Sequence, residues 1–158
     1  MIKPNGVSSL FLVFLIFILS LISLELIIPT TSPIAEDQTP EKHEIFVEEG
    51  GSYTNVNPVA LAMMLKNKDF LLINVHIPYE GEIDKTDLFI PYNEIEQNLE
   101  KLPVDKNTKI VLYCRTNRMS DIAARILVKL GYTNVWSLDG GMIVWKLKGF
   151  PLIDRRSR

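Results

Sequence analysis

The chain begins with one long apolar block, and shorter apolar runs separated by polar stretches follow it. Between Val7 and Ile28, 17 of the 22 residues are apolar and Glu25 is the one charged residue. A helix of this length extends about 33 Å, enough to cross a hydrocarbon core of roughly 30 Å. We therefore expect residues 7–28 to form a transmembrane helix, with residues 1–6 as a short cytoplasmic segment before it.

A cleaved secretory signal peptide is the alternative for this block. Its apolar core is usually shorter, and a small-x-small cleavage site should follow it. Pro33 disturbs each candidate cleavage site, which favours an uncleaved signal anchor. Lys3 precedes the helix and Lys42 is the first basic residue after it, so the basic bias places the N-terminus in the cytoplasm. The rest of the chain is then extracytoplasmic, tethered if the helix is retained and secreted or periplasmic if it is cleaved.

Residues 29–50 contain three prolines and six acidic residues, with few large apolar ones. Such a segment cannot bury enough surface to offset the entropy of ordering it, so its composition predicts a linker. A domain over residues 51–153 should follow, and residues 154–158 form a short basic tail.

Within the domain, the apolar pattern alternates between strand and helix periods. Asn57 followed by Pro58 is typical of a helix start, and Ile122, Ile126 and Leu130 align on one side of a later helix. This alternation indicates an α/β fold with a parallel sheet covered on both faces and ligands at the carboxyl ends of its strands. The expected strands are 53–56, 70–75, 109–113 and 135–138, and the expected helices are 58–68, 93–102, 120–130 and 142–148.

Charge and cysteine content narrow the function classes. The net charge of −2, from 17 basic and 19 acidic residues, gives no broad positive field for nucleic acid. The single cysteine excludes an intrachain disulfide, a redox pair and a cysteine-rich zinc site. The sequence also has no metal-ligand cluster, dinucleotide fingerprint or P-loop, so we expect no metal and no cofactor.

One constellation indicates chemistry. Cys114 ends the strand KIVLYC, a short polar loop follows, and a helix begins near Ser120. Amides in such a loop converge on an anion, and the helix dipole adds to their effect. Arg115 and Arg118 raise the local positive potential, which should favour the thiolate, the nucleophilic form of cysteine. A lone cysteine is otherwise usually a small buried apolar residue.

These residues, read together, resemble a known family. LLINV, IVLYCRTNRMS, LGYTNVWSLDGG and the following Trp145 are similar to a single-domain rhodanese, a thiosulfate sulfurtransferase-like module, over about residues 51–152. The resemblance implies a three-layer sandwich with a five-stranded parallel sheet. It also implies a cysteine that accepts sulfane sulfur as a persulfide and passes it on.

By this resemblance Cys114 matches the nucleophile. The loop that holds the sulfur and the anionic donor corresponds to Arg115, Thr116, Asn117, Arg118, Met119 and Ser120. Asn117 stands where many members have glycine, and asparagine is among the few other residues that tolerate a left-handed backbone. Met119 is unusual in a charged loop, and forms either an apolar lip on the pocket or a helix-start residue packed inward. Gly140 and Gly141 should let the backbone pass close to this loop.

The chain also departs from the family. Many members have Asp-Val-Arg where this chain has Asn74-Val75-His76, and the usual Gly-His-Ile-Pro-Gly-Ala segment is replaced by Gly81-Glu82-Ile83 and the residues after it. His76 restores a positive charge only when it is protonated, or is simply a polar residue at a strand end. These differences leave the choice of sulfur donor open.

We therefore expect a membrane-tethered sulfurtransferase or persulfide carrier. It would use a small sulfane-sulfur donor and pass the sulfur to an external thiol, a partner protein or cyanide, because the chain has no second cysteine. The alternative is a non-catalytic interaction module of the same fold. A phosphatase is disfavoured because its signature needs arginine six residues after the cysteine, and that position is Ser120.

Overall fold

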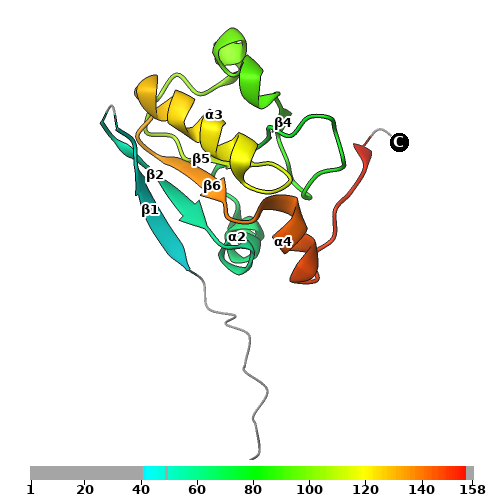
Figure 1. Cartoon of the computed structure of the whole chain (residues 1–158). Coiled ribbons are helices and arrows are strands. Elements are labelled where there is room, and N and C mark those ends of the chain that lie inside the picture. Colours follow the sequence, from blue (N-terminus) through cyan, green and yellow to red (C-terminus); the bar gives the residue numbers. More distant parts are fainter. Residues whose placement is uncertain (1–40, 49, 156–158) are drawn as a thin grey trace, which may run out of the picture. The chain divides into compact units, whose positions relative to one another are not determined.

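The computed structural model of the protein describes residues 41–48 and 50–155, which form one α/β domain (Figure 1). Six strands make a single sheet in the order β1-β2-β6-β5-β3-β4. The strands are β1 (Lys42–Phe46), β2 (Ser52–Val56), β3 (Leu71–Asn74), β4 (Leu88–Phe89), β5 (Ile110–Tyr113) and β6 (Val135–Leu138). The helices are α2 (Pro58–Met64), α3 (Arg118–Lys129) and α4 (Gly141–Leu147), with 3₁₀ helices η1 (Leu65–Asn67), η2 (Tyr92–Glu94) and η3 (Glu96–Lys101).

The sheet is mixed, which corrects the expectation of a five-stranded parallel sheet. Strands β2 to β6 pair in parallel, but β1 pairs antiparallel with β2, from Lys42 opposite Val56 to Phe46 opposite Ser52. Residues 42–46 are therefore a strand, although they fall within the acidic stretch predicted as a linker. Backbone pairing with β2 orders them, and Ile45 packs against the core. His43, expected in the linker, lies on this strand 3.0 Å from Glu41.

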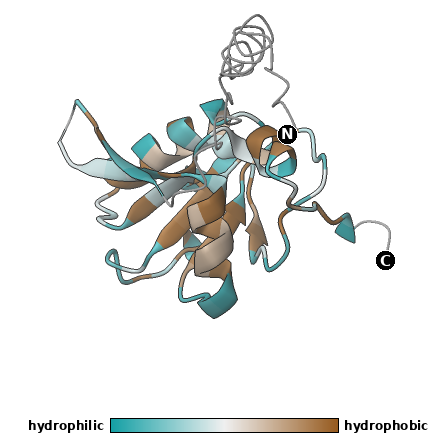
Figure 2. Cartoon of the chain, turned by 90° about the horizontal axis from the view of Figure 1, so that it is seen from below, coloured by the Kyte–Doolittle hydropathy of each residue, from teal (hydrophilic) through white to brown (hydrophobic). Residues whose placement is uncertain are grey.

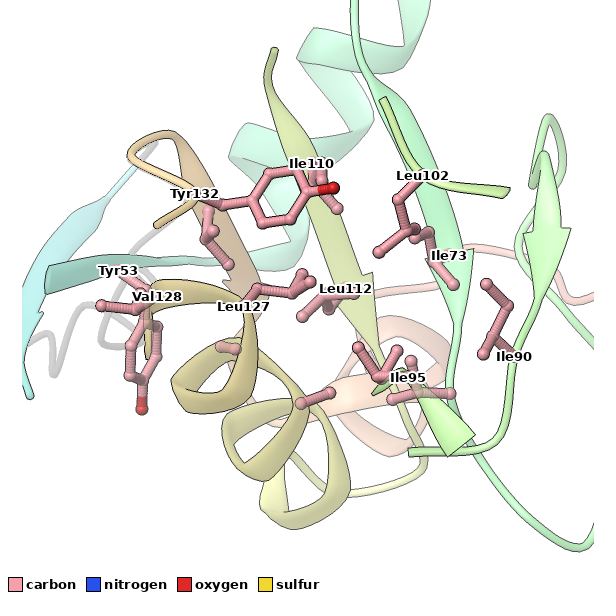
Figure 3. Packing of buried hydrophobic residues seen from close by; sticks show 14 of the residues in the cluster. Tyr53, Ile73, Ile90, Ile95, Leu102, Ile110, Leu112, Leu127, Val128 and Tyr132 are labelled. Atoms are coloured by element: carbon pink, nitrogen blue, oxygen red, sulfur yellow. The ribbon is translucent and has the colours of Figure 1, made fainter. Parts of the chain in front are cut away.

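Two hydrophobic cores lie on opposite faces of the sheet. Because side chains alternate along a strand, Ile73 and Leu112 join the core under α3, whereas Leu72 and Val111 join the core under α2 and α4. Figure 3 shows the first core, where Leu127 of α3 lies next to Leu112 of β5 and Val128 lies next to Tyr53 of β2. In Figure 2 the central strands are accordingly among the most hydrophobic parts of the domain.

The helix α2 begins as the sequence predicts. The Asn57 side chain accepts a hydrogen bond from the Ala60 amide at 2.8 Å, and Pro58 occupies the first turn. This cap satisfies one of the amides that an α-helix leaves unpaired at its start. Leu61 and Leu65 then pack into the second core.

The buried face of α3 differs from the predicted one. Its buried residues recur every three or four positions and so share one face of the helix, whereas Ile122 is 38% exposed. Ile126 and Leu130 lie at the edge of the core and are partly buried. The small side chains bring the helix close to the sheet, which leaves the larger Ile122 on the rim. The stripe is Ser120, Ala123, Ala124, Leu127 and Val128.

Two further elements were not predicted in this form. The segment expected as one helix over 93–102 forms the 3₁₀ helices η2 and η3, and Asn98, with φ −122°, kinks the backbone within η3. The two-residue strand β4 pairs with β3 in a stretch expected to be irregular. Ile95 and Leu102 still reach the core from these turns.

The predicted membrane span at residues 7–28 lies outside the described residues. Within residues 41–48 and 50–155, we find no helix whose length and apolar character would allow it to cross a bilayer.

Candidate active site

Cys114 lies in the cysteine loop, residues 114–117, which joins the end of β5 to the start of α3. Its backbone continues a strand that is buried along its whole length, so the residue is only 1% exposed. The loop lies at the carboxyl end of the parallel strands, the edge at which α/β sheets bind their ligands. The thiol therefore sits in a structured pocket beneath the start of a helix.

Two donors from the start of α3 point at the Cys114 sulfur. The Asn117 amide donates to Sγ at 3.2 Å, and the Ser120 hydroxyl lies 3.7 Å from it. Hydrogen bonds to sulfur and the positive end of a helix dipole both stabilise a thiolate more than a thiol. The same donors stabilise negative charge on any group that occupies this position.

Asn117 adopts the left-handed backbone that the sequence required of it, with φ +100°. Its side chain is held at both ends: Nδ2 donates to Asp121 at 2.9 Å, and Oδ1 accepts from the Ser137 hydroxyl at 3.2 Å. These two bonds offset the strain of a positive φ at a residue other than glycine. Asn117 thus supplies both the turn and a link to β6.

The other side of the loop rests against the start of α4. The amides of Met142 and Ile143 donate to the carbonyls of Cys114 and Arg115, at 2.9 and 3.0 Å. An ideal Cβ on Gly141 would lie 2.4 Å from the Cys114 carbonyl oxygen, far inside contact distance. At Gly140, which has φ +66°, a Cβ would clash instead with Val144 at 2.2 Å.

The rim of the site on the β3 side is polar. Glu80 lies between His76, with Oε1 3.6 Å from Nε2, and Arg115, with Oε2 3.4 Å from Nε. His76 is 5% exposed, and its ring nitrogens make no hydrogen bond to any residue that the structure describes. Asn74 fixes the loop after β3 by donating to the Gly81 carbonyl at 3.1 Å and accepting from the His76 amide at 3.0 Å.

Within the part of the chain that the structure describes, the remaining residues of the predicted loop donate no hydrogen bond to the sulfur. Arg115, Thr116 and Arg118 are exposed around the loop. Met119 is partly buried and packs against the core under α3, so it follows the second of the two alternatives for this residue. A small hollow of about 100 Å³ next to the loop is lined by Glu80, Arg115, Met142, Ile143, Lys146 and Leu152.

Two residues that the sequence did not single out complete the site. Ser137 of β6 lies 3.0 Å from both the Ser120 hydroxyl and Asp121 Oδ1, and it is fully buried. Asp121 is the next residue after Ser120 and accepts from Asn117 as well. The one signal for Ser137 in the sequence is its position as a polar residue in an otherwise apolar strand.

Burial raises the pKa of two ionisable groups behind the loop, Asp121 and Tyr53. Desolvation is the main cause that raises the pKa of Asp121, opposed by hydrogen bonds from Ser137 and Tyr53 and by the charge of Arg125. Burial, reinforced by the nearby Asp121 charge, raises the pKa of Tyr53 to about 12. Asp121 therefore holds a proton more readily than an exposed aspartate does.

Comparison with known proteins identifies the fold. The family model for the rhodanese-like domain matches residues 59–148. The chain belongs to this family. It is 33% identical over 89 residues to a sulfurtransferase of Allochromatium vinosum, covering 54% of this chain and 80% of that one.

Two other proteins are also similar. The thiosulfate sulfurtransferase PspE of Escherichia coli is 33% identical over 70 residues, covering 43% of this chain and 67% of the relative. The crystal structure of a rhodanese-related protein from Thermoplasma volcanium superposes with a TM-score of 0.54 at 24% identity, over 63% of this chain and 96% of that one. At this identity the superposition supports the fold alone.

Proposed function

We propose that this rhodanese-like protein is a sulfurtransferase or persulfide carrier that uses Cys114. The observation that carries the proposal is the pair of donors from the start of α3, the Asn117 amide and the Ser120 hydroxyl, at the sulfur of the chain's one cysteine. Its relatives include proteins named as sulfurtransferases, one of them a thiosulfate sulfurtransferase.

The first step loads the cysteine. The Cys114 thiolate attacks the outer sulfur of a thiosulfate-like donor and forms an S–S bond. The sulfur–sulfur bond of the donor breaks, and sulfite leaves with the electron pair. The donors at the start of α3 stabilise the negative charge that the bound sulfur then carries.

The second step unloads it. An acceptor thiolate or cyanide attacks the outer sulfur, and Cys114 leaves as the thiolate with the electron pair of the broken bond. The acceptor must be external, because the chain contains one cysteine. The Arg115 side chain, 55% exposed and held by Glu80, lies on the rim where a donor or acceptor would approach.

Mass spectrometry tests the proposal. The full chain is incubated with thiosulfate and compared with Cys114→Ser and with a Val104→Ser control, which changes an exposed side chain outside the cysteine loop. We expect one added sulfur atom on the wild type and on the control, removed by cyanide, and none on Cys114→Ser. Absence of the adduct at every thiosulfate concentration would refute sulfur transfer by Cys114.

A non-catalytic interaction module is the second candidate. The observation that favours it is the burial of Cys114, which limits access to the sulfur. Complementation of a deletion strain separates the two. Full function of Cys114→Ser in the cell supports the interaction module, whereas loss of function supports the enzyme.

The tether and location are a separate part of the proposal. The apolar composition of residues 7–28 supports a membrane anchor that leaves the domain extracytoplasmic. Protease treatment of intact cells or spheroplasts tests it. Without protease the domain should be recovered in the membrane fraction, and added protease should digest it. Protection of the domain would reverse the orientation.

A further inference from the structure

We infer that the hollow lined by Glu80, Arg115 and Lys146 binds the amino-acid head group of the thiol that removes sulfur from Cys114. The acceptor is then a thiol that carries an ammonium and a carboxylate on one carbon, as cysteine and glutathione do. This inference rests on the proposed function, because it names the class of acceptor in the second step.

The hollow adjoins Cys114 through its lining residues. Arg115 follows Cys114 directly in the chain, and the Met142 amide donates to the Cys114 carbonyl at 2.9 Å. The Ile143 amide donates in turn to the Arg115 carbonyl at 3.0 Å. Figure 1 shows the start of α4 next to the loop that leads into α3. A group held in the hollow therefore lies beside the cysteine loop.

The charged side chains of the hollow come from three separate elements and differ in sign. Glu80 lies in the loop after β3, Arg115 in the cysteine loop, and Lys146 in the last turn of α4. Arg115 Nε and Glu80 Oε2 are 3.4 Å apart, and both side chains are about half exposed. An ion pair that is open to water contributes little to stability. Each of its members can therefore take a charged group of a ligand as its partner instead.

The signs of these charges select the class of ligand. A dianion such as thiosulfate would be attracted by the two cations but repelled by the Glu80 carboxylate. An amino-acid head group matches all three side chains, because its carboxylate pairs with Arg115 and Lys146 while its ammonium pairs with Glu80. The hollow is therefore suited to the acceptor of the second step and not to the anionic donor of the first.

The size and the floor of the hollow fit the same group. Its volume of about 100 Å³ is roughly that of three molecules of liquid water. This is room for an ammonium, an α-carbon and a carboxylate, so the remainder of a longer thiol such as glutathione lies outside. Met142, Ile143 and Leu152 supply apolar surface for the carbon atoms of the ligand.

Binding in the hollow holds the acceptor beside the persulfide. The acceptor thiolate attacks the outer sulfur and forms a new S–S bond. The bond between that sulfur and Cys114 breaks, and its electron pair stays on Cys114. The product is the persulfide of the amino-acid thiol, and its head group is unchanged. Holding the two reactants together in this way raises the rate of transfer.

The first test compares transfer from the sulfur-loaded full chain to three thiols. Cysteine carries both charges, cysteamine lacks the carboxylate, and N-acetylcysteine lacks the ammonium. Rate constants are compared at equal concentrations of the thiolate form, so that the reactivity of the sulfur is matched. We expect cysteine to react about fivefold faster than either analogue, the effect of one partly exposed ion pair.

Two variants assign the charges. Lys146→Gln should reduce the preference for cysteine over cysteamine about threefold, because Arg115 still pairs with the carboxylate. Glu80→Gln should remove most of the preference for cysteine over N-acetylcysteine. Lys66→Gln and Glu100→Gln are the matched controls, since they change exposed charges elsewhere and should keep both preferences.

A second measurement tests binding without sulfur transfer. S-methylcysteine and S-methylglutathione keep the head group but have no free thiol. Ligand-observed saturation-transfer NMR with the full chain should detect binding to the wild type and a weaker signal with Lys146→Gln. Binding of S-methylcysteine alone assigns the hollow to cysteine, binding of S-methylglutathione alone assigns it to glutathione, and binding of both supports recognition of the shared head group.

The two measurements separate this inference from the proposed function. Equal rates with the three thiols, or preferences that neither variant changes, would refute recognition of the head group. A sulfur adduct on Cys114 without binding of either analogue refutes the hollow alone. Binding that Lys146→Gln weakens, without any sulfur adduct, supports the hollow as an amino-acid site and refutes sulfur transfer.

Discussion

At the scale of single residues, the site depends on the close approach of the cysteine loop to the backbone at the start of α4. The cysteine loop passes so close to Gly141 that a methyl group there would overlap the Cys114 carbonyl. Glycine therefore keeps the two amide–carbonyl bonds between α4 and the loop. Gly149 has the same kind of backbone, with φ +82°, but nothing lies within 4 Å of its ideal Cβ.

This contrast gives a matched pair of substitutions. Gly141→Ala should lower the free energy of unfolding by about 3 kcal/mol, since it adds a clash to the strain of a positive φ. Gly149→Ala should lower it by about 1 kcal/mol through the strain alone. Urea unfolding measures both. Equal losses would show that the approach of the loop to α4 is not the constraint.

Asp121 gives a prediction on pH and stability. Its pKa is raised on folding, mainly by desolvation, so the folded protein holds the proton more tightly than the unfolded chain. The stability that this group contributes is full below the unfolded pKa, about 4, and declines as the pH rises through the folded pKa. Urea unfolding from pH 3 upward should show this decline in the wild type and not in Asp121→Asn. A parallel decline in both proteins would contradict it.

At the scale of elements, α3 is held by small residues. Ala123 and Ala124 are fully buried against the sheet, and Leu127 fills the core beside them. The larger Ile122 lies on the rim. The contribution of an α3 residue to the free energy of unfolding therefore depends on whether it faces the sheet, and not on its hydrophobicity.

Two truncations on α3 test this. Leu127→Ala should cost about 3 kcal/mol of unfolding free energy, because it opens a cavity in a packed core. Ile122→Ala should cost less than about 1 kcal/mol, because much of its surface is already in water. Chemical unfolding of both variants measures the difference, and a larger loss for Ile122→Ala would overturn the assignment of the buried face.

The sequence predicted those elements that local pattern determines. The buried runs at β3 and β5 and the Asn57 cap of α2 each carry their signal within a few residues. Strand β1 and the two-residue β4 do not, because partners distant in the chain order them. The strand, loop and helix around Cys114 likewise carry a local signal for the position of the cysteine loop.

The contacts behind the cysteine loop could not be predicted in this way. Ser137 reaches Ser120 and Asp121 from a strand 16 or 17 residues further along the chain. No local pattern connects a serine in β6 with the first turn of α3. The contact exists because β6 pairs with β5 and so lies beneath the helix that follows β5.

At the scale of the whole molecule, the two cores share their strands. Each of β3 and β5 sends alternate side chains into both, for example Leu72 and Ile73 from β3. Neither core can lose its packing while the sheet remains intact. The domain should therefore unfold in one transition.

Two probes test this. Trp145 lies in the core under α2 and α4, whereas far-ultraviolet circular dichroism sums the helices on both faces of the sheet. Tryptophan fluorescence and far-ultraviolet circular dichroism should give coincident urea transitions, and Leu112→Ala should move both by the same amount, about 3 kcal/mol in unfolding free energy. Separate midpoints would show that the cores unfold independently.

The attachment of the cysteine loop to α4 also provides an intrinsic fluorescent reporter of the site. Trp145 is in the same short helix that bonds to the Cys114 and Arg115 carbonyls, and its indole donates to the Pro151 carbonyl at 2.9 Å and packs on Phe150. Indole emission responds to small changes in such surroundings. If Cys114 carries sulfur as proposed, its loading and unloading should change the intrinsic fluorescence, which can be followed in real time with no label attached to the protein.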